Sequence, residues 1–196
     1  GTVMGNVYHT KEEMIDCVNA FYEGMVQRSE EMKQHPNYKT GENYAYLGLP
    51  PCFLIFDEYV AFFEMLGTKE SVGLLSQLKK IVMLGRQAGY FLIVACQRPD
   101  AKYFSDGIRD NFNFRVGLGR ISELGYGMLF GSDVKKQFFQ KRIKGRGYCD
   151  VGTSVISEFY TPLVPKGHDF LQTIGSLAQA RQDGTATCEA KGDGTD

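Results

Sequence analysis

Apolar side chains recur at helical spacing near the start of the chain. Met14, Val18, Phe21 and Met25 stand at i, i+4, i+7 and i+11, so they share one face of a helix. The stretch Thr10-Lys11-Glu12-Glu13 just before them fits a capping box. The pattern predicts a helix from residue 10 to about residue 33, with a stripe that serves core packing and an end before Pro36.

Two short apolar runs follow a polar loop over residues 34–51. Cys52 to Phe56 and Tyr90 to Cys96 have the length of strands, and their unbroken apolar character predicts a parallel sheet covered on both faces. Between them we expect a helix over 59–66 and a longer one that ends near Gly85 or Gly89. The stripe of the longer helix is predicted to be Val72, Leu75, Leu78 and Val82. Strand, helix and strand in this order indicate an α/β fold with a parallel sheet.

The remaining third of the chain predicts shorter elements. A third strand is expected over 114–118, a helix over 122–130, and a hairpin from 148–150 and 155–160 around Gly152. Residues 175–196 contain one Leu and no Ile, Val or aromatic residue. We therefore expect one domain over 1–170 and a disordered tail over 171–196.

Composition and charge exclude several classes of protein. Hydrophobic residues make up 43% of the 196 positions, which excludes general disorder. Lys and Arg number 22 against 23 Asp and Glu, 22 − 23 = −1, so any nucleic-acid site would have to be local. No apolar run reaches the length of a membrane span, and the first residues lack the basic start and apolar stretch of a signal peptide, so none is expected. The sequence has no CxxC pair and its histidines are far apart, which indicates reduced thiols in a cytosolic protein and no metal site of the zinc type; the cysteines are Cys17, Cys52, Cys96, Cys149 and Cys188.

The residues with the clearest chemistry follow the two buried strands. Asp57 and Glu58 come directly after the first strand, and Gln97 follows the second. In an open parallel sheet ligands bind outside these strand ends, so the three side chains suggest one shared site. Asp57 would hold Mg²⁺ and Glu58 would act on water. The alternatives are that the acidic pair caps the next helix and that Gln97 is an ordinary turn residue.

A cluster of positive charge lies further along. Six basic residues fall within twelve positions without an acid, interleaved with Phe138 and Phe139; they are Lys135, Lys136, Lys141, Arg142, Lys144 and Arg146. Such a run can neutralise several phosphates of DNA. A solvated face or a contact between subunits is the alternative.

Three stretches together resemble the FtsK/SpoIIIE motor ATPases. Phe53 to Glu58 is similar to a Walker B segment. Leu84 to Pro99 resembles the family's Arg-x-x-Gly, apolar strand and Gln-Arg-Pro pattern. Ile108 to Phe112, with the Arg115-Val116-Gly117 strand, continues the likeness, which covers roughly residues 10–165 and is nearest to FtsK-like proteins of conjugative elements.

The resemblance implies a RecA-like, P-loop NTPase core that binds ATP and Mg²⁺, assembles as a ring, usually a hexamer, and pulls double-stranded DNA. Carried over by position, Asp57 would help to hold Mg²⁺, Glu58 would polarise the attacking water, and Gln97 would sense the γ-phosphate. Arg86 matches the position of an arginine finger that reaches the neighbouring subunit's nucleotide. A basic residue that balances the dipole of its own helix is the alternative for Arg86. The resemblance also lends support to DNA contacts by Lys141, Arg142, Lys144 and Arg146, made to the phosphate backbone.

One part of the family's pattern is missing. No GxxxxGK[ST] phosphate loop occurs in this sequence, and the start Gly1-Thr2-Val3-Met4-Gly5 has no lysine. Either the chain is the latter part of a motor domain, incomplete at its N-terminal side and with a C-terminal β-hairpin, or it is a relative without ATPase activity. In both cases we expect no ATP hydrolysis by the chain alone, because most of the triphosphate's binding groups are absent.

Three functions remain open at this point. The first is part of an ATP-driven DNA translocase in conjugative transfer, cytoplasmic and at the membrane face in the full-length protein. The second is the related class of ATPases that secrete proteins. The third is a scaffold module that keeps the fold without hydrolysing ATP.

Overall fold

The computed structural model describes residues 7–97, 102–104, 106–131, 134, 143–153 and 155–182. The chain divides into two units. One is Thr10–Pro162, and the other combines Gly1–His9 with Leu163–Asp196. Both sheets, both core clusters and all the predicted site residues belong to Thr10–Pro162, which we call the main unit.

Helix α1 (Lys11–Gln34) opens the main unit as predicted. Its capping box is present: the Glu13 amide donates to the Thr10 hydroxyl at 3.3 Å, and the Thr10 amide donates to the Glu13 carboxylate at 3.2 Å. Val18 and Met25 are buried, and the stripe continues to Met32 in the last turn. The expected core-packing role of this helix is confirmed.

Strands β1 (Cys52–Phe56) and β2 (Tyr90–Val94) pair in parallel, in register from Cys52 opposite Tyr90 to Phe56 opposite Val94. The crossover between them holds α2 (Tyr59–Glu64) and α3 (Thr68–Ala88). Gly89 ends α3 with a positive φ of 77°, a conformation that favours glycine. The predicted strand, helix, strand unit and its parallel sheet are therefore confirmed.

The buried stripe of α3 differs from the predicted one. The side chains that face the core belong to Leu74, Leu78, Ile81 and Ala88, and Gly85 is buried among them. Val72 is 65% exposed. Leu78 of the predicted stripe is confirmed as buried, and Leu75 is partly buried against the core. Val72 is wrong as a core residue, because it is apolar but lies on the outer face.

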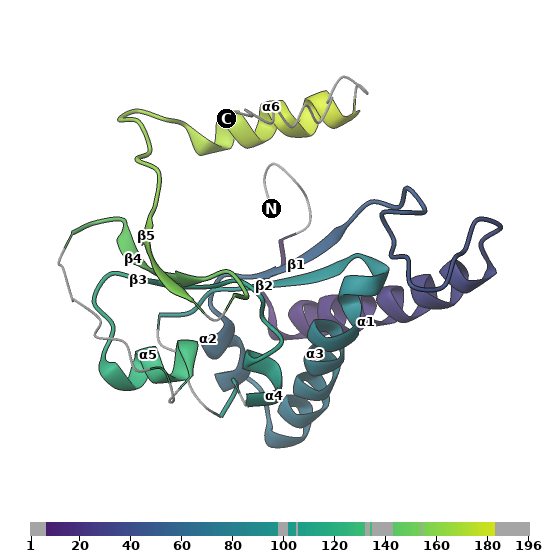
Figure 1. Ribbon diagram of the computed structural model, residues 1–196, viewed down its shortest axis with the longest axis horizontal. Helices are drawn as coiled ribbons and strands as arrows, with labels where there is room; N and C mark the ends of the chain where they lie inside the picture. Colours follow the sequence, from purple (N-terminus) through teal and green to yellow (C-terminus); the bar gives the residue numbers. More distant parts are fainter. Residues whose placement is uncertain are drawn as a thin grey trace. The chain divides into compact units, whose positions relative to one another are not determined.

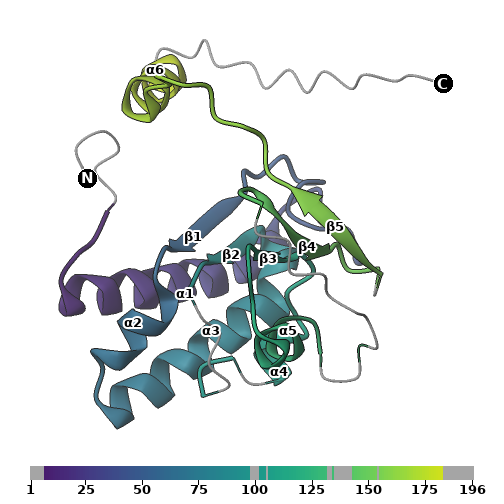
Figure 2. The same ribbon diagram turned by 90° about the vertical axis from the view of Figure 1, so that its left-hand side faces the viewer.

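The two faces of the β1–β2 sheet are covered very differently. Helices α1 and α3 lie on one side of the strands, as Figure 1 shows and as the turned view in Figure 2 confirms. Leu54 points to that side and is 8% exposed, whereas its neighbour Ile55 is 67% exposed. Phe53 and Ile93 are also about half exposed, at 54% and 48%. The prediction that both faces of this strand are covered is thus wrong for the described residues.

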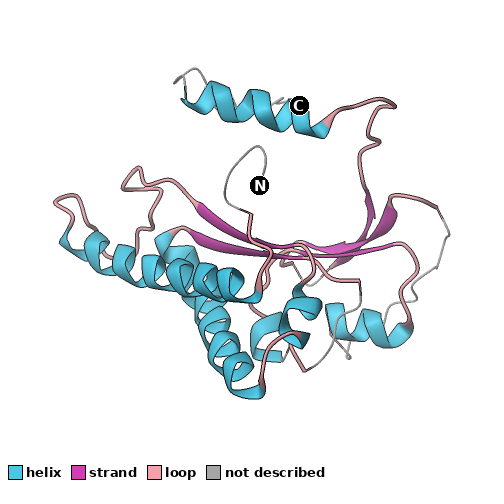
Figure 3. Cartoon of the chain, turned by 180° about the vertical axis from the view of Figure 1, so that it is seen from behind, coloured by secondary structure: helices cyan, strands magenta, loops and turns pink. Residues whose placement is uncertain are grey.

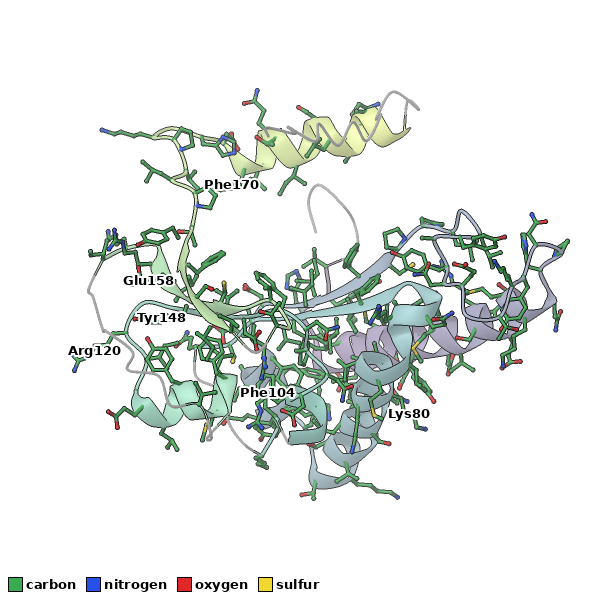
Figure 4. All side chains as sticks on the ribbon, in the orientation of Figure 1. Lys80, Phe104, Arg120, Tyr148, Glu158 and Phe170 are labelled. Carbon is green, nitrogen blue, oxygen red and sulfur yellow. The ribbon has the colours of Figure 1, made fainter. Side chains whose placement is uncertain are left out.

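Strands β3 (Arg115–Leu118), β4 (Arg146–Asp150) and β5 (Ile156–Tyr160) form a second sheet in that order, and both pairings are antiparallel. The predicted third strand and the hairpin are confirmed, although the third strand pairs with the hairpin rather than in parallel with β2. Helix α4 (Asp106–Arg109) precedes this sheet, and α5 (Glu123–Phe130) packs against it. Tyr148 of β4, labelled in Figure 4, forms an edge-on contact with Tyr126 of α5.

A buried ion pair ties this second sheet together. Arg115 of β3 donates to the Asp150 carboxylate of β4 at 2.6 Å and to the Leu129 carbonyl of α5 at 3.2 Å. Asp150 is almost completely buried, and it also accepts from the Gly152 amide at 2.9 Å. The pair therefore joins two strands and the helix that covers them.

The second unit contains helix α6 (Phe170–Gln182), shown in cyan with the other helices in Figure 3. The expected disordered tail differs from the structure over residues 171–182, which are helical, while residues 183–196 lie outside the described part. The segment contains Leu, Ala, Gln and Arg, which favour helix even where few large apolar residues are present. Within the described residues, no helix combines the length and the apolar character needed to cross a membrane.

Candidate functional site

The acidic pair forms a short turn at the carboxyl end of β1. The hydrogen bonds between the strands continue past the strand ends on both sides of Asp57 and Glu58. Ala95 donates its amide to the Phe56 carbonyl at 2.8 Å, and its carbonyl accepts from the Tyr59 amide at 3.0 Å. These two bonds bracket the pair and fix it at the edge where β2 also ends.

Gln97 meets this turn from the second strand. Its amide nitrogen Nε2 donates to the Glu58 carboxylate oxygen Oε1 at 3.3 Å. Asp57, Glu58 and Gln97 are all exposed, so a ligand in solvent can reach them. The structure thus brings together three of the predicted site residues at one edge of the sheet.

The structure gives Glu58, the N-cap residue of α2, no side-chain capping bond, although the acidic pair lies at the start of this helix, where the helix dipole favours carboxylates. A carboxylate that served the helix would accept from an amide of the first turn. Its described hydrogen bond goes to Gln97 instead, so the carboxylate belongs to the strand-end cluster.

Cys96 lies between the strand and Gln97, and its place differs from the prediction. The strand ends at Val94, so Cys96 stands beyond it and is half-buried rather than inside an apolar strand. Burial raises the pKa of the Cys96 thiol, and the nearby negative charge of Glu58 raises this pKa further. The thiol is therefore kept protonated near neutral pH, and a protonated thiol is a poor nucleophile.

The donor set at this edge fits Mg²⁺. Magnesium is usually held by one or two carboxylates together with substrate phosphates and water, and Asp57 and Glu58 supply exposed carboxylates of this kind. Among the described residues, no group of three or more His, Cys, Asp or Glu lies close enough together to hold a metal ion.

Arg86 lies at the opposite edge of the sheet. It is an exposed residue in the last turn of α3. Gly89, which ends that helix, lies beside the start of β1, because its carbonyl accepts from the Cys52 amide at 2.7 Å. The length of β1, five residues at about 3.3 Å each, or ~16 Å, separates this edge from Glu58. The structure therefore does not bring Arg86 to the acidic pair of its own chain.

The basic run is only partly described. Lys135, Lys136, Lys141 and Arg142 lie outside the described residues. Lys144 is exposed in the turn before β4. The Arg146 guanidinium lies 4.6 Å from the centre of the Tyr160 ring on β5.

Sequence reasoning missed the buried residues that pack next to the Glu58–Gln97 pair. Tyr59 follows Glu58 directly and is 1% exposed. Its hydroxyl donates to the Tyr103 carbonyl at 3.3 Å. Its ring lies 4.7 Å from that of Phe104, which Figure 4 labels among the helices. The sequence contained two signals of this support. Tyr59 is an aromatic residue directly after the acidic pair, and Tyr103 and Phe104 are an aromatic pair shortly after Gln97.

Comparison with known proteins adds one relative of high similarity. The chain is 54% identical over 190 residues to the FtsK domain-containing protein YdcQ of Bacillus subtilis (strain 168). The match covers 97% of this chain and 39% of YdcQ, so the chain spans about two fifths of the length of this curated relative. No protein-family model matches the sequence.

Solved structures share the fold at low sequence identity. The pCW3 conjugation coupling protein TcpA, solved with ATPgS, gives a TM-score of 0.61 at 17% identity over 83% of this chain and 49% of TcpA. The type VII secretion ATPase EccC of Thermomonospora curvata gives 0.60 at 18% identity over 88% of this chain and 21% of EccC. EssC of Geobacillus thermodenitrificans gives 0.57 at 15% identity, over 89% of this chain and 32% of EssC.

EccC and EssC are named as ATPases, and the likeness shows that the α/β core described above shares the fold of these neighbours. The sequence match, at more than half identity over nearly the whole of this chain, is to a protein named for its FtsK domain, and it confirms the resemblance to the FtsK/SpoIIIE family.

Proposed function

We propose that this chain is part of an ATP-driven double-stranded DNA translocase of the FtsK/SpoIIIE type that acts in conjugative transfer. The observation that carries the proposal is the contact between the Glu58 carboxylate and the Gln97 amide, 3.3 Å apart at the carboxyl ends of two parallel strands. Ligands of open α/β sheets bind at this edge. The similarity to an FtsK domain-containing protein and the fold shared with TcpA, which was solved with ATPgS, support a nucleotide as the ligand.

Each residue at the edge has a role that its chemistry suits. Asp57 holds Mg²⁺, which when bound with ATP neutralises charge on the phosphate oxygens. Glu58 accepts a hydrogen bond from the attacking water and so orients and polarises it. Gln97 both donates and accepts hydrogen bonds, so it can join the γ-phosphate to that water.

Arg86 serves a neighbouring subunit in this proposal. Its distance from Glu58 of the same chain excludes a direct role there, whereas a ring of subunits, a homo-oligomer that we expect to be a hexamer, brings Arg86 of one copy to the nucleotide of the next. The guanidinium is a permanent planar charge that suits the transition state of phosphoryl transfer.

DNA contacts are assigned to the basic run. Lys141, Arg142, Lys144 and Arg146 would contact the phosphate backbone, which carries no sequence information and therefore suits a translocase. We place the full-length protein in the cytoplasm at the face of the membrane.

The first test measures ATP hydrolysis by the full-length polypeptide that contains this chain. Glu58→Gln keeps the size of the side chain but removes its basicity, so we expect kcat to fall by about a hundredfold or more. Glu64→Gln is the matched control, because Glu64 is an exposed carboxylate at the other end of α2. Equal activity of the two variants would contradict the role of Glu58.

The second test asks whether Arg86 acts between subunits. Full-length Arg86→Ala and Glu58→Gln proteins should each be inactive. When they are mixed, an Arg86→Ala subunit that retains Glu58 can receive Arg86 from a Glu58→Gln neighbour, so part of the activity should return. If mixing restores nothing while both variants still assemble, Arg86 does not act in this way.

A second candidate function is a protein-secretion ATPase, favoured by the fold that the chain shares with EccC and EssC. Stimulation of the full-length ATPase by double-stranded DNA supports the translocase, and stimulation by a substrate peptide supports secretion. A scaffold module without hydrolysis is the third candidate, and a full-length protein that has no phosphate loop would support it. Residues 1–196 alone should show no Mg²⁺-dependent hydrolysis.

A further inference from the structure

Tyr59 occupies an unusual place at the edge of the sheet. It follows Glu58 directly and begins α2, so its backbone is continuous with the acidic turn. Its side chain nevertheless points away from solvent and is 1% exposed. Glu58 and Tyr59 therefore send adjacent side chains in opposite directions, one to the site and one to the core.

Tyr59 holds the chain on both sides of Gln97. Before Gln97, the Tyr59 amide donates to the Ala95 carbonyl at 3.0 Å. After it, the Tyr59 hydroxyl donates to the Tyr103 carbonyl at 3.3 Å. The Tyr59 and Phe104 rings lie 4.7 Å apart, and the Tyr103 ring stacks on Phe63 of α2 at 5.3 Å.

Gln97 itself has little packing of its own. Its side chain is exposed, and its described hydrogen bond is the one to Glu58. An exposed side chain keeps a defined position only if the backbone on either side of it is fixed. Tyr59, the residue next to Glu58, contributes to such a restraint through its amide bond to Ala95, two residues before Gln97, and through its hydroxyl bond to Tyr103, six residues after it.

We propose that Tyr59 is a positioning residue for the Glu58–Gln97 pair, and that its hydroxyl keeps the Gln97 amide within reach of Glu58. The inference rests on the proposed ATPase function of this edge. Loss of the hydroxyl removes the bond to the Tyr103 carbonyl while the ring continues to fill the core. Hydrolysis should suffer more than nucleotide binding, because a small displacement of a positioned group lowers kcat strongly.

The experiment compares two tyrosines in the full-length protein. Tyr59→Phe removes the hydroxyl that reaches Tyr103, and we expect kcat for ATP hydrolysis to fall about tenfold with KM changed less than about twofold. Tyr126→Phe is the matched control: Tyr126 is equally buried, but it belongs to the separate core around α5. Its kcat should stay at the wild-type value.

A double-mutant cycle with Gln97→Ala separates positioning from general stability. If Tyr59 acts through Gln97, Tyr59→Phe should cost much less than tenfold when Gln97 is already absent. Phe104→Leu, which weakens the same anchor, should lower kcat in the same direction and by a smaller factor. The thermal unfolding midpoints of all variants show whether they are folded.

The possible failures are distinguishable. An inactive wild-type full-length protein contradicts the proposed function before any variant is made. An active wild type with a Tyr59→Phe variant that behaves like Tyr126→Phe overturns the positioning role alone. The same tenfold loss with and without Gln97 also overturns it, because the hydroxyl would then act independently of the amide.

Discussion

The two faces of the β1–β2 sheet carry the same kinds of side chain but have opposite surroundings. Leu54 packs beneath the strands in the core cluster that also contains residues of α1 and α3, while Ile55, the next residue along, is two-thirds exposed. Hydrophobicity therefore identifies a strand here without telling which of its sides is packed. Burial alone determines which of these residues stabilises the main unit.

The largest expected effect comes from the two neighbours on β1. Leu54→Ala should lower the free energy of unfolding by about 2–4 kcal/mol, because it leaves a cavity in the core. Ile55→Ala removes a similar volume from the exposed face and should change it by no more than about 0.5 kcal/mol. Urea denaturation of the 196-residue chain measures both. Similar losses would mean that the outer face is packed in solution.

Two glycines of α3 allow a similar comparison between a packed and an open position on a helix. A Cβ at Gly85 would meet the backbone carbonyl of Tyr90, whereas nothing lies within 4 Å of a Cβ at Gly73. Gly85→Ala should therefore destabilise the chain by about 1–3 kcal/mol. Gly73→Ala should stabilise it by about 0.5–1 kcal/mol, because alanine favours helix. If both changes stabilise, α3 does not lie against β2 as described.

The third prediction uses pH to test the burial of Tyr59 on the covered side of the sheet. Burial raises the pKa of the Tyr59 phenol well above its usual value of 10.0, and the Cys96 charge contributes to the rise. Above pH 10 the unfolded chain loses this proton before the folded chain does, so stability is full below pH 10 and falls as pH rises. The slope for one such group is about 1.4 kcal/mol per pH unit.

Denaturation at several pH values between 8 and 11 measures that slope. Tyr59→Phe removes the group, so the loss of stability above pH 10 should become shallower. Tyr46→Phe is a useful control, because that tyrosine is exposed. An unchanged slope in the Tyr59→Phe chain would contradict the burial of the phenol.

The smallest effect is expected at the carboxyl ends of β1 and β2, where Glu58 lies near Cys96. Glu58 raises the pKa of Cys96 in addition to burial. Glu58→Gln should therefore lower that pKa and increase the thiolate fraction near pH 8. The alkylation rate of Cys96 by iodoacetamide, followed by mass spectrometry of its peptide, should increase severalfold at most. Glu64→Gln should leave it unchanged, and a decrease with Glu58→Gln would contradict the contact.

Much of the site was predictable because it depends on strand ends. Asp57, Glu58 and Gln97 follow two apolar runs, and parallel pairing necessarily brings the ends of those runs together. Tyr59 was not predictable in the same way. A tyrosine beside two carboxylates has equal reason to face solvent or core, and the choice depends on Tyr103 and Phe104, more than forty positions away.

The sequence by itself determined the order of the elements, the capping box of α1, the parallel pair of strands and the resemblance to the FtsK/SpoIIIE motors, because each depends on neighbouring residues or on short motifs. Only the tertiary structure decided which face of the sheet is packed, where the stripe of α3 begins, and that Arg86 and Glu58 lie at opposite edges. Those features depend on contacts between distant segments. A local pattern shows that a side chain is apolar or charged, but not what covers it.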